Sequence, residues 1–133
     1  MKKSTNKLSS SNSEKIFTND CFCNKKALSL FINDLMRKRG LNGPDVYNRA
    51  GISKANWSNY ISEKSNPSPE NARRLTIGLK CTMEEAKELL SYCGMTFTMN
   101  NKYDNGFLYC LENHIYNMID VSIYIDRHCN LAA

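Results

Sequence analysis

Two histidines are the side chains best suited to proton transfer or metal binding in this 133-residue sequence. His114 or His128 could serve as a general base only beside a nucleophile and an orienting acid. Neither has such partners at the spacing of a catalytic motif. The six glycines are scattered, so the sequence has no glycine-rich phosphate-binding loop. We therefore predict a protein that is not an enzyme and uses no cofactor.

Six cysteines could bind a metal or form disulfides. Cys21 and Cys23 form one close pair, whereas a structural zinc site usually shows close pairs of ligands on both sides. The other four lie far apart in the sequence: Cys81, Cys93, Cys110 and Cys129. Secreted disulfide-rich domains are usually shorter and denser in cysteine. We expect reduced thiols and no metal site.

Charge is distributed unevenly along the chain. Residues 1–26 contain six lysines and two acidic residues, residues 27–80 contain nine basic and four acidic residues, and residues 81–133 contain three and seven. A basic first part followed by an acidic end is typical of a protein with one surface that faces a polyanion. Ordinary solvated helix faces account for the same pattern equally well.

The first 26 residues are mostly Ser, Asn and Lys. Such a segment buries too little apolar surface to offset the entropy lost on ordering, so we expect a flexible basic tail. No apolar run follows the initial lysines as it would in a signal peptide, and no run of about 18 apolar residues could span a membrane. We therefore expect a cytoplasmic protein with no membrane partner.

Apolar residues recur three and four positions apart in five successive segments, which predicts five amphipathic helices. Asn42 and Ser53 can cap the second and third helices, and Gly51 can end the second. A capping box of Thr82 and Glu85 opens the fifth. The expected helices cover approximately residues 27–38, 43–50, 54–62, 69–79 and 83–93.

The last third of the chain gives a weaker pattern. Helical spacing predicts a sixth helix from about Tyr103 to Asn113. Residues 121–125 alternate β-branched residues in a way that is typical of a strand. No other segment alternates and could pair with it, so we assign residues 116–128 to a seventh helix. The expected fold class is all-α.

Two short helices joined by a tight turn that contains glycine are typical of a helix-turn-helix. The stretch LNGPDVYNRAGISKANWSNYISEKSNPS resembles the Cro and phage-repressor superfamily, also called the XRE type, over about residues 27–93. The positions that carry the resemblance are Leu41, Val46, Arg49-Ala50-Gly51-Ile52-Ser53, Trp57, Tyr60 and Pro67-Ser68.

The chain beyond this region resembles a bacterial subset of the superfamily in which an irregular linker and two more helices follow the core. The matching positions are Leu89, Gly94, Lys102, Asp104 and Leu111. The resemblance implies a five-helix, repressor-like helix-turn-helix domain at residues 27–94. It also implies a C-terminal helical extension at residues 95–133, packed on that domain.

In this superfamily the third helix lies in the major groove, and its first turns contact base edges. The resemblance therefore assigns base reading to Lys54, Ala55, Asn56, Ser58 and Asn59. It assigns phosphate contacts to Asn42, Lys64 and Lys38. Asparagine can bond an adenine edge, lysine a guanine edge, and an alanine methyl can touch that of thymine. Small polar residues also occupy any exposed helix, so this site is a hypothesis.

Three positions depart from the pattern of the superfamily. Tyr47 stands where a small alanine is usual, Gly43 where a glutamine often contacts phosphate, and Glu63 where a glycine commonly follows the third helix. Together with the acidic C-terminal part of the chain, they are consistent with a scaffold that has changed toward binding protein.

Two functions therefore remain open. The first is a DNA-binding transcriptional regulator, expected to act as a homodimer on half-sites about one helical turn apart. Its dimer contact, or equally its own core, would use apolar residues of the C-terminal helices: Phe107, Leu108, Leu111, Ile115, Met118 and Ile119. The alternative is a protein–protein interaction adaptor that keeps the scaffold without specific binding to double-stranded DNA.

Overall fold

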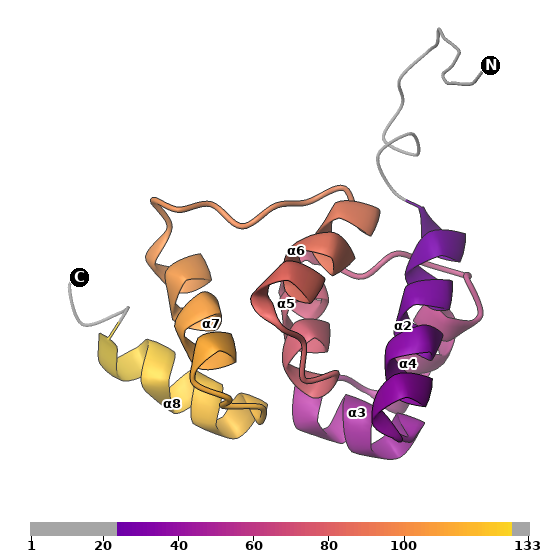
Figure 1. Cartoon of the computed structure of the whole chain (residues 1–133), viewed down its shortest axis with the longest axis horizontal. Helices are drawn as coiled ribbons and strands as arrows, with labels where there is room; N and C mark the ends of the chain where they lie inside the picture. The colour runs from indigo at the N-terminus through magenta and orange to yellow at the C-terminus, as the bar shows by residue number, and fades with distance from the viewer. Residues whose placement is uncertain (1–23, 129–133) are drawn as a thin grey trace, which may run out of the picture.

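The computed structural model describes residues 24–128, and all regular structure within them is helical (Figure 1). The expected all-α class is confirmed. The helices are α2 (Lys25–Arg39), α3 (Gly43–Ala50), α4 (Lys54–Ile61), α5 (Pro69–Gly78), α6 (Met83–Tyr92), α7 (Lys102–Glu112) and α8 (Met118–His128). No helix in residues 24–128 combines the length and the apolar character needed to cross a membrane.

Local capping explains most helix boundaries. Helix α2 begins two residues earlier than expected, because the side chain of Asn24 accepts a hydrogen bond from the Ala27 amide at 2.9 Å. Lys25 and Lys26 therefore belong to α2 and not to the expected tail. The capping box of Thr82 and Glu85 is present at the start of α6. Residues 1–23 of the expected tail lie outside the described residues, as do Cys21, Cys23 and Cys129.

The segment with strand-like alternation is helical, as expected from its lack of a partner. Met118, Val121 and Ile125 of α8 are buried, at positions separated by three and four residues. Ile123, which shares the β-branched alternation, is 46% exposed. Burial therefore follows the helical period, because packing against the other helices outweighs the preference of β-branched residues for strands.

The apolar residues of the last two helices mostly fill their own core. Phe107, Leu108, Leu111 and Met118 are buried, and Ile115 is partly buried against the same core. Ile119 alone of the six candidates for a dimer contact is exposed. The structure therefore supports core packing, and not a dimer contact, for all of these six residues except Ile119.

The described cysteines contribute to packing. Cys81, Cys93 and Cys110 are buried and form no disulfide within residues 24–128. Burial raises the pKa of the Cys81 thiol well above its ordinary value. No group of three or more potential ligand side chains in the described part of the chain could hold a metal ion.

Helices α3 and α5 make the largest interhelical contact, and their backbones nearly touch at Gly78. A Cβ atom on Gly78 would collide with the Val46 carbonyl oxygen and would lie 2.9 Å from the Ala50 Cβ. The Gly78 carbonyl accepts hydrogen bonds from Nε and Nη2 of Arg49, at 3.2 and 2.8 Å. Only glycine permits this approach, which fixes α3 on α5.

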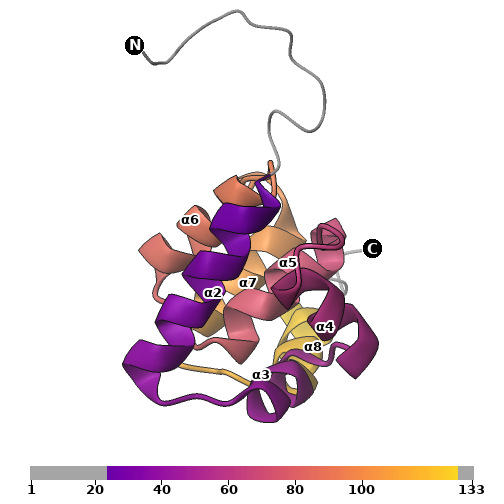
Figure 2. The same cartoon turned by 90° about the vertical axis from the view of Figure 1, so that its right-hand side faces the viewer.

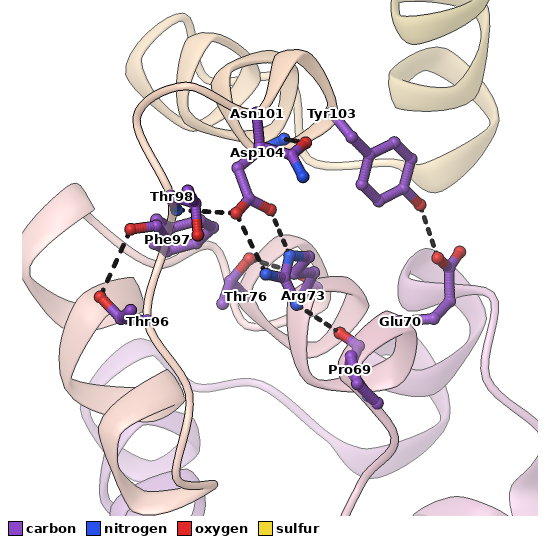
Figure 3. A network of polar contacts seen from close by, with 10 residues as sticks. All are labelled: Pro69, Glu70, Arg73, Thr76, Thr96, Phe97, Thr98, Asn101, Tyr103 and Asp104. Atoms are coloured by element: carbon purple, nitrogen blue, oxygen red, sulfur yellow. Dashed lines mark hydrogen bonds and ion pairs between the residues drawn. The ribbon is translucent and has the colours of Figure 1, made fainter.

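A buried ion pair attaches the α7–α8 pair to the other helices (Figure 3). The Arg73 guanidinium of α5 bonds both carboxylate oxygens of Asp104 in α7, with Nη2 3.1 Å from Oδ2. Asp104 is 1% exposed and also accepts the Thr98 amide at 2.8 Å. Burial acts to raise the pKa of Asp104, but the bonds from Arg73 and Thr98 and the charge of Arg73 outweigh it. The pKa therefore lies below that of an ordinary carboxyl group.

Asp104→Asn is expected to lower the free energy of unfolding at pH 7 by about 3 kcal/mol, because it leaves the Arg73 cation buried beside a neutral group. A carboxyl group with a depressed folded pKa stabilises the fold above its unfolded pKa of about 4 and loses this contribution as pH falls through the folded value. The difference between the two proteins should be constant from about pH 7 to 5 and shrink below about pH 4.

Urea unfolding at each pH measures this difference. Glu112→Gln, at the exposed opposite end of α7, is the matched control and should change stability little at any pH. A difference between wild type and Asp104→Asn that persisted unchanged at pH 3 would contradict the assignment.

Candidate nucleic-acid interface

Helix α4 is anchored from beneath by two aromatic residues and by bonds to two other helices. Trp57 and Tyr60 are buried, with 8% and 4% of their surface exposed. The Tyr60 hydroxyl accepts a hydrogen bond from Nδ2 of Asn71 in α5 at 2.8 Å. The Ser29 hydroxyl of α2 donates to the carbonyl of Ile61 at 2.8 Å. These contacts hold α4 against both α2 and α5.

The connection from α3 to α4 is short and capped on both sides. Asn42 caps α3 by accepting the Asp45 amide at 2.9 Å, and Ser53 caps α4 by accepting the Asn56 amide at 3.1 Å. Gly51 ends α3 in the left-handed conformation, with φ of 68°. Local signals in the sequence therefore set the angle at which α4 leaves α3.

Helix α4 lies at the surface of the molecule (Figure 2), and the residues assigned to base reading are on its solvent side. Lys54, Ala55, Asn56 and Ser58 are exposed, and Asn59 is half-buried. They alternate with the buried Trp57 and Tyr60, so the helix has a polar outer edge above an aromatic anchor.

The three residues assigned to phosphate contacts are exposed but come from separate segments. Lys38 lies in the last turn of α2, Asn42 caps α3, and Lys64 follows α4. The Asn42 side-chain oxygen is occupied by the Asp45 amide. Its side-chain NH₂ group is therefore the part of Asn42 suited to a phosphate oxygen.

Two of the departures from the superfamily pattern are linked through Trp57. A Cβ atom on Gly43 would lie 3.0 Å from the Trp57 Nε1, so the indole occupies the space where a glutamine side chain would begin. The rings of Tyr47 and Trp57 are tilted by 50°, with centroids 6.3 Å apart. The third departure, Glu63, has φ of 66°, a backbone conformation that favours glycine.

A groove of about 380 Å³ lies between α3 and α4, next to the polar edge of α4. Its lining residues are Pro44, Tyr47, Lys54, Trp57, Ser58, Ile61 and Ser62. This groove could not be predicted from the helical pattern of the sequence. The signal for it was the large Tyr47, at a position where the superfamily that the sequence resembles usually has a small residue.

Four arginines bond carboxylates or carbonyls of the fold itself. Arg39 pairs with Glu85, Arg49 bonds the Gly78 carbonyl, Arg73 pairs with Asp104, and Arg74 pairs with Glu70. The cations assigned to the candidate interface are all lysines: Lys38, Lys54 and Lys64. Two acidic residues are also exposed beside these lysines: Asp45 in the first turn of α3 and Glu63 after α4. The net charge of this surface is therefore only weakly positive.

We find no match to the chain among protein-family models, curated protein sequences or solved structures. The features of this chain that indicate a function are therefore the geometry of α3 and α4 and the residues that these helices expose.

Trp57→Ala is expected to lower the free energy of unfolding by about 3–5 kcal/mol, because it removes the main apolar anchor of α4 and leaves a cavity. Asn56→Ala, one position away on the exposed edge, should change it by less than about 0.5 kcal/mol. Thermal and urea unfolding of both variants tests this contrast. Equal stability of the two variants would mean that Trp57 does not support α4.

Proposed function

We propose that this protein is a DNA-binding transcriptional regulator that reads the major groove with α4. The observation that carries the proposal is the exposed polar edge of α4, with Lys54, Asn56 and Ser58, held over the buried Trp57 and Tyr60. The eight residues of α4 make a helix about 12 Å long, close to the width of the major groove.

The start of α4 would approach the base edges first. Lys54 and Asn56 lie in its first turn, where the helix dipole favours a negatively charged partner such as DNA. Asn56 offers both a donor and an acceptor to an adenine, and Lys54 offers donors to a guanine. The first of the two short helices, α3, would cross the backbone, with Lys38 and Asn42 near the phosphates.

The use of arginines inside the fold limits the electrostatic part of binding. Lys38, Lys54 and Lys64 are the exposed cations of this surface. If each neutralises one phosphate, the logarithm of the binding constant should fall with the logarithm of salt concentration with a slope of roughly −3 per protomer. The basic residues at positions 1–26 would add to this slope.

Selection of genomic fragments followed by fluorescence titration at two salt concentrations tests the proposal. Asn56→Ala and Lys54→Ala are each expected to weaken binding to the selected fragment by about 10-fold, because each removes contacts to a base edge. Lys38→Ala should weaken binding to all fragments alike and reduce the salt slope by about 1. Lys87→Ala, an exposed lysine on α6, is the control and should leave affinity unchanged. Selective binding that survives Asn56→Ala would show that the base-reading assignment is wrong.

The groove between α3 and α4 favours a second candidate function, an adaptor that binds another protein. Its lining includes the apolar faces of Tyr47, Trp57 and Ile61, which suit an inserted apolar side chain. In the titration above, an adaptor would bind all fragments equally and weakly, with affinity lost at moderate salt. Specific capture of one protein that Ile61→Lys abolishes would then support the adaptor.

Glu63 affects stability through its backbone conformation and would affect DNA binding through its charge. Two substitutions separate these effects. Glu63→Gly is expected to raise the free energy of unfolding by about 1 kcal/mol, because it removes the strain of a left-handed residue with a Cβ atom. Glu63→Gln keeps the strain but removes the charge. Both variants should bind DNA about 3-fold more tightly at low salt, since each removes one acid next to the interface. A rise in affinity with only one of them would contradict a purely electrostatic effect.

A further inference from the structure

Three hydrogen bonds connect α7 to the turn between α3 and α4. The Tyr103 hydroxyl of α7 donates to Oε1 of Glu70 in α5 at 2.6 Å (Figure 3). Arg74, also in α5, donates from Nε to Oε2 of Glu70 at 2.8 Å and from Nη1 to the Gly51 carbonyl at 2.9 Å. One continuous relay therefore joins Tyr103, Glu70, Arg74 and Gly51.

Helix α8 contacts the same turn from another side. Met118, the first residue of α8, is buried, and its Cβ lies 3.6 Å from the position that a Cβ on Gly51 would take. The Arg74 Nη1 lies 2.7 Å from that position. Gly51 therefore lies against both Arg74 and α8, and no larger residue would fit there without moving one of them.

Near neutral pH, Tyr103 is protonated and Glu70 is ionised, as the hydrogen bonds of the relay require. Burial and the hydrogen bond to the Glu70 anion raise the pKa of Tyr103, so its hydroxyl keeps the proton that it donates. Burial acts to raise the pKa of Glu70, but the bonds from Tyr103 and Arg74 outweigh it and hold the pKa below its ordinary value. Glu70 therefore stays ionised and accepts both bonds, which are stronger than bonds between neutral groups.

We propose that the α7–α8 pair sets the position of the turn before α4, and that Tyr103, Glu70 and Arg74 are the positioning residues that transmit this effect. Displacement of α7 from α5 would remove the Tyr103 bond that fixes the Glu70 carboxylate. Glu70 would then hold Arg74 less firmly beside the Gly51 carbonyl. The coupling itself concerns only the helices of this chain. Its consequence for DNA rests on the proposed function, because α4 begins three residues after Gly51.

Tyr103→Phe is the most selective test of the relay. It removes only the hydroxyl and keeps the ring, which packs edge-to-face on Phe107 at 5.1 Å. Tyr92→Phe is the matched control, because it removes a tyrosine–glutamate bond of the same 2.6 Å length, to Glu88 within α6. Hydrogen exchange of the backbone amides of Gly51, Ile52, Asn56 and Trp57 is the readout, because these amides are hydrogen-bonded in the turn and at the start of α4. Trp57, the single tryptophan of the chain, also reports on the α3–α4 packing by fluorescence.

We expect Tyr103→Phe to speed exchange of these four amides by about 5-fold, the effect of losing one net hydrogen bond, with α2 amides unchanged within about 2-fold. Tyr92→Phe should leave both groups unchanged. Arg74→Met should have a larger effect, about 20-fold, and the double variant should equal Arg74→Met alone, because both residues act through one relay.

Unchanged exchange at the amides of Gly51, Ile52, Asn56 and Trp57, equal acceleration of all amides, or additive effects in the double variant would overturn the proposal. The DNA measurement is separate: Tyr103→Phe should weaken binding to a selected fragment by about 3-fold without changing the salt slope. If exchange changes as expected while no variant, nor the wild type, binds any fragment selectively, the proposed function fails and the coupling stands.

Discussion

The backbone contact between α3 and α5 at Gly78 governs the geometry of the molecule, because α5 is the helix to which the other functional elements attach. Gly78 holds α3 through Arg49, and Asn71 holds α4 through the hydroxyl of Tyr60. Arg73 holds α7, and Arg74 reaches the turn before α4. Successive turns of α5 thus fix the candidate interface on one side and the C-terminal helices on another. A shift of α3 on α5 would move the turn, the start of α4 and its polar edge together.

Most arginines of residues 27–80 bond groups of the protein itself, so the net positive charge of this region overstates the charge available to a ligand. The basic excess of residues 27–80 suggested a surface that faces a polyanion, but Arg39, Arg49, Arg73 and Arg74 bond carboxylates or carbonyls of the fold itself. The guanidinium group suits this role, because its planar set of donors can bond two acceptors at once. The lysines, with flexible stems and one strongly hydrated charge, are what the candidate interface exposes. Electrostatic attraction to DNA would therefore be weaker than the sequence composition implies.

Short-range signals made the helices predictable, and long-range contacts limited the rest. Asn42, Ser53 and the Thr82 capping box act within three residues, so the sequence alone placed α3, α4 and α6 nearly correctly. The exposed edge of α4 was predictable for the same reason, since helical spacing separates it from Trp57. The Arg73–Asp104 pair joins residues 31 positions apart, and nothing in local sequence couples them. The groove was also missed, because its volume depends on how two side chains from different helices pack.

The two candidate functions use overlapping surfaces, which makes them physically exclusive at any one moment. Lys54 and Ser58 belong both to the polar edge assigned to base reading and to the lining of the groove. A protein side chain inserted between Tyr47 and Trp57 would cover these residues, and the first turn of α4 could then not enter a major groove. Binding of a protein partner and binding of DNA would therefore compete. Each ligand would lower the apparent affinity of the protein for the other. Gly43 and Tyr47 contribute to this overlap in different ways. Gly43 leaves room for the indole of Trp57, and the Tyr47 ring lies beside that indole, so that both rings line the groove.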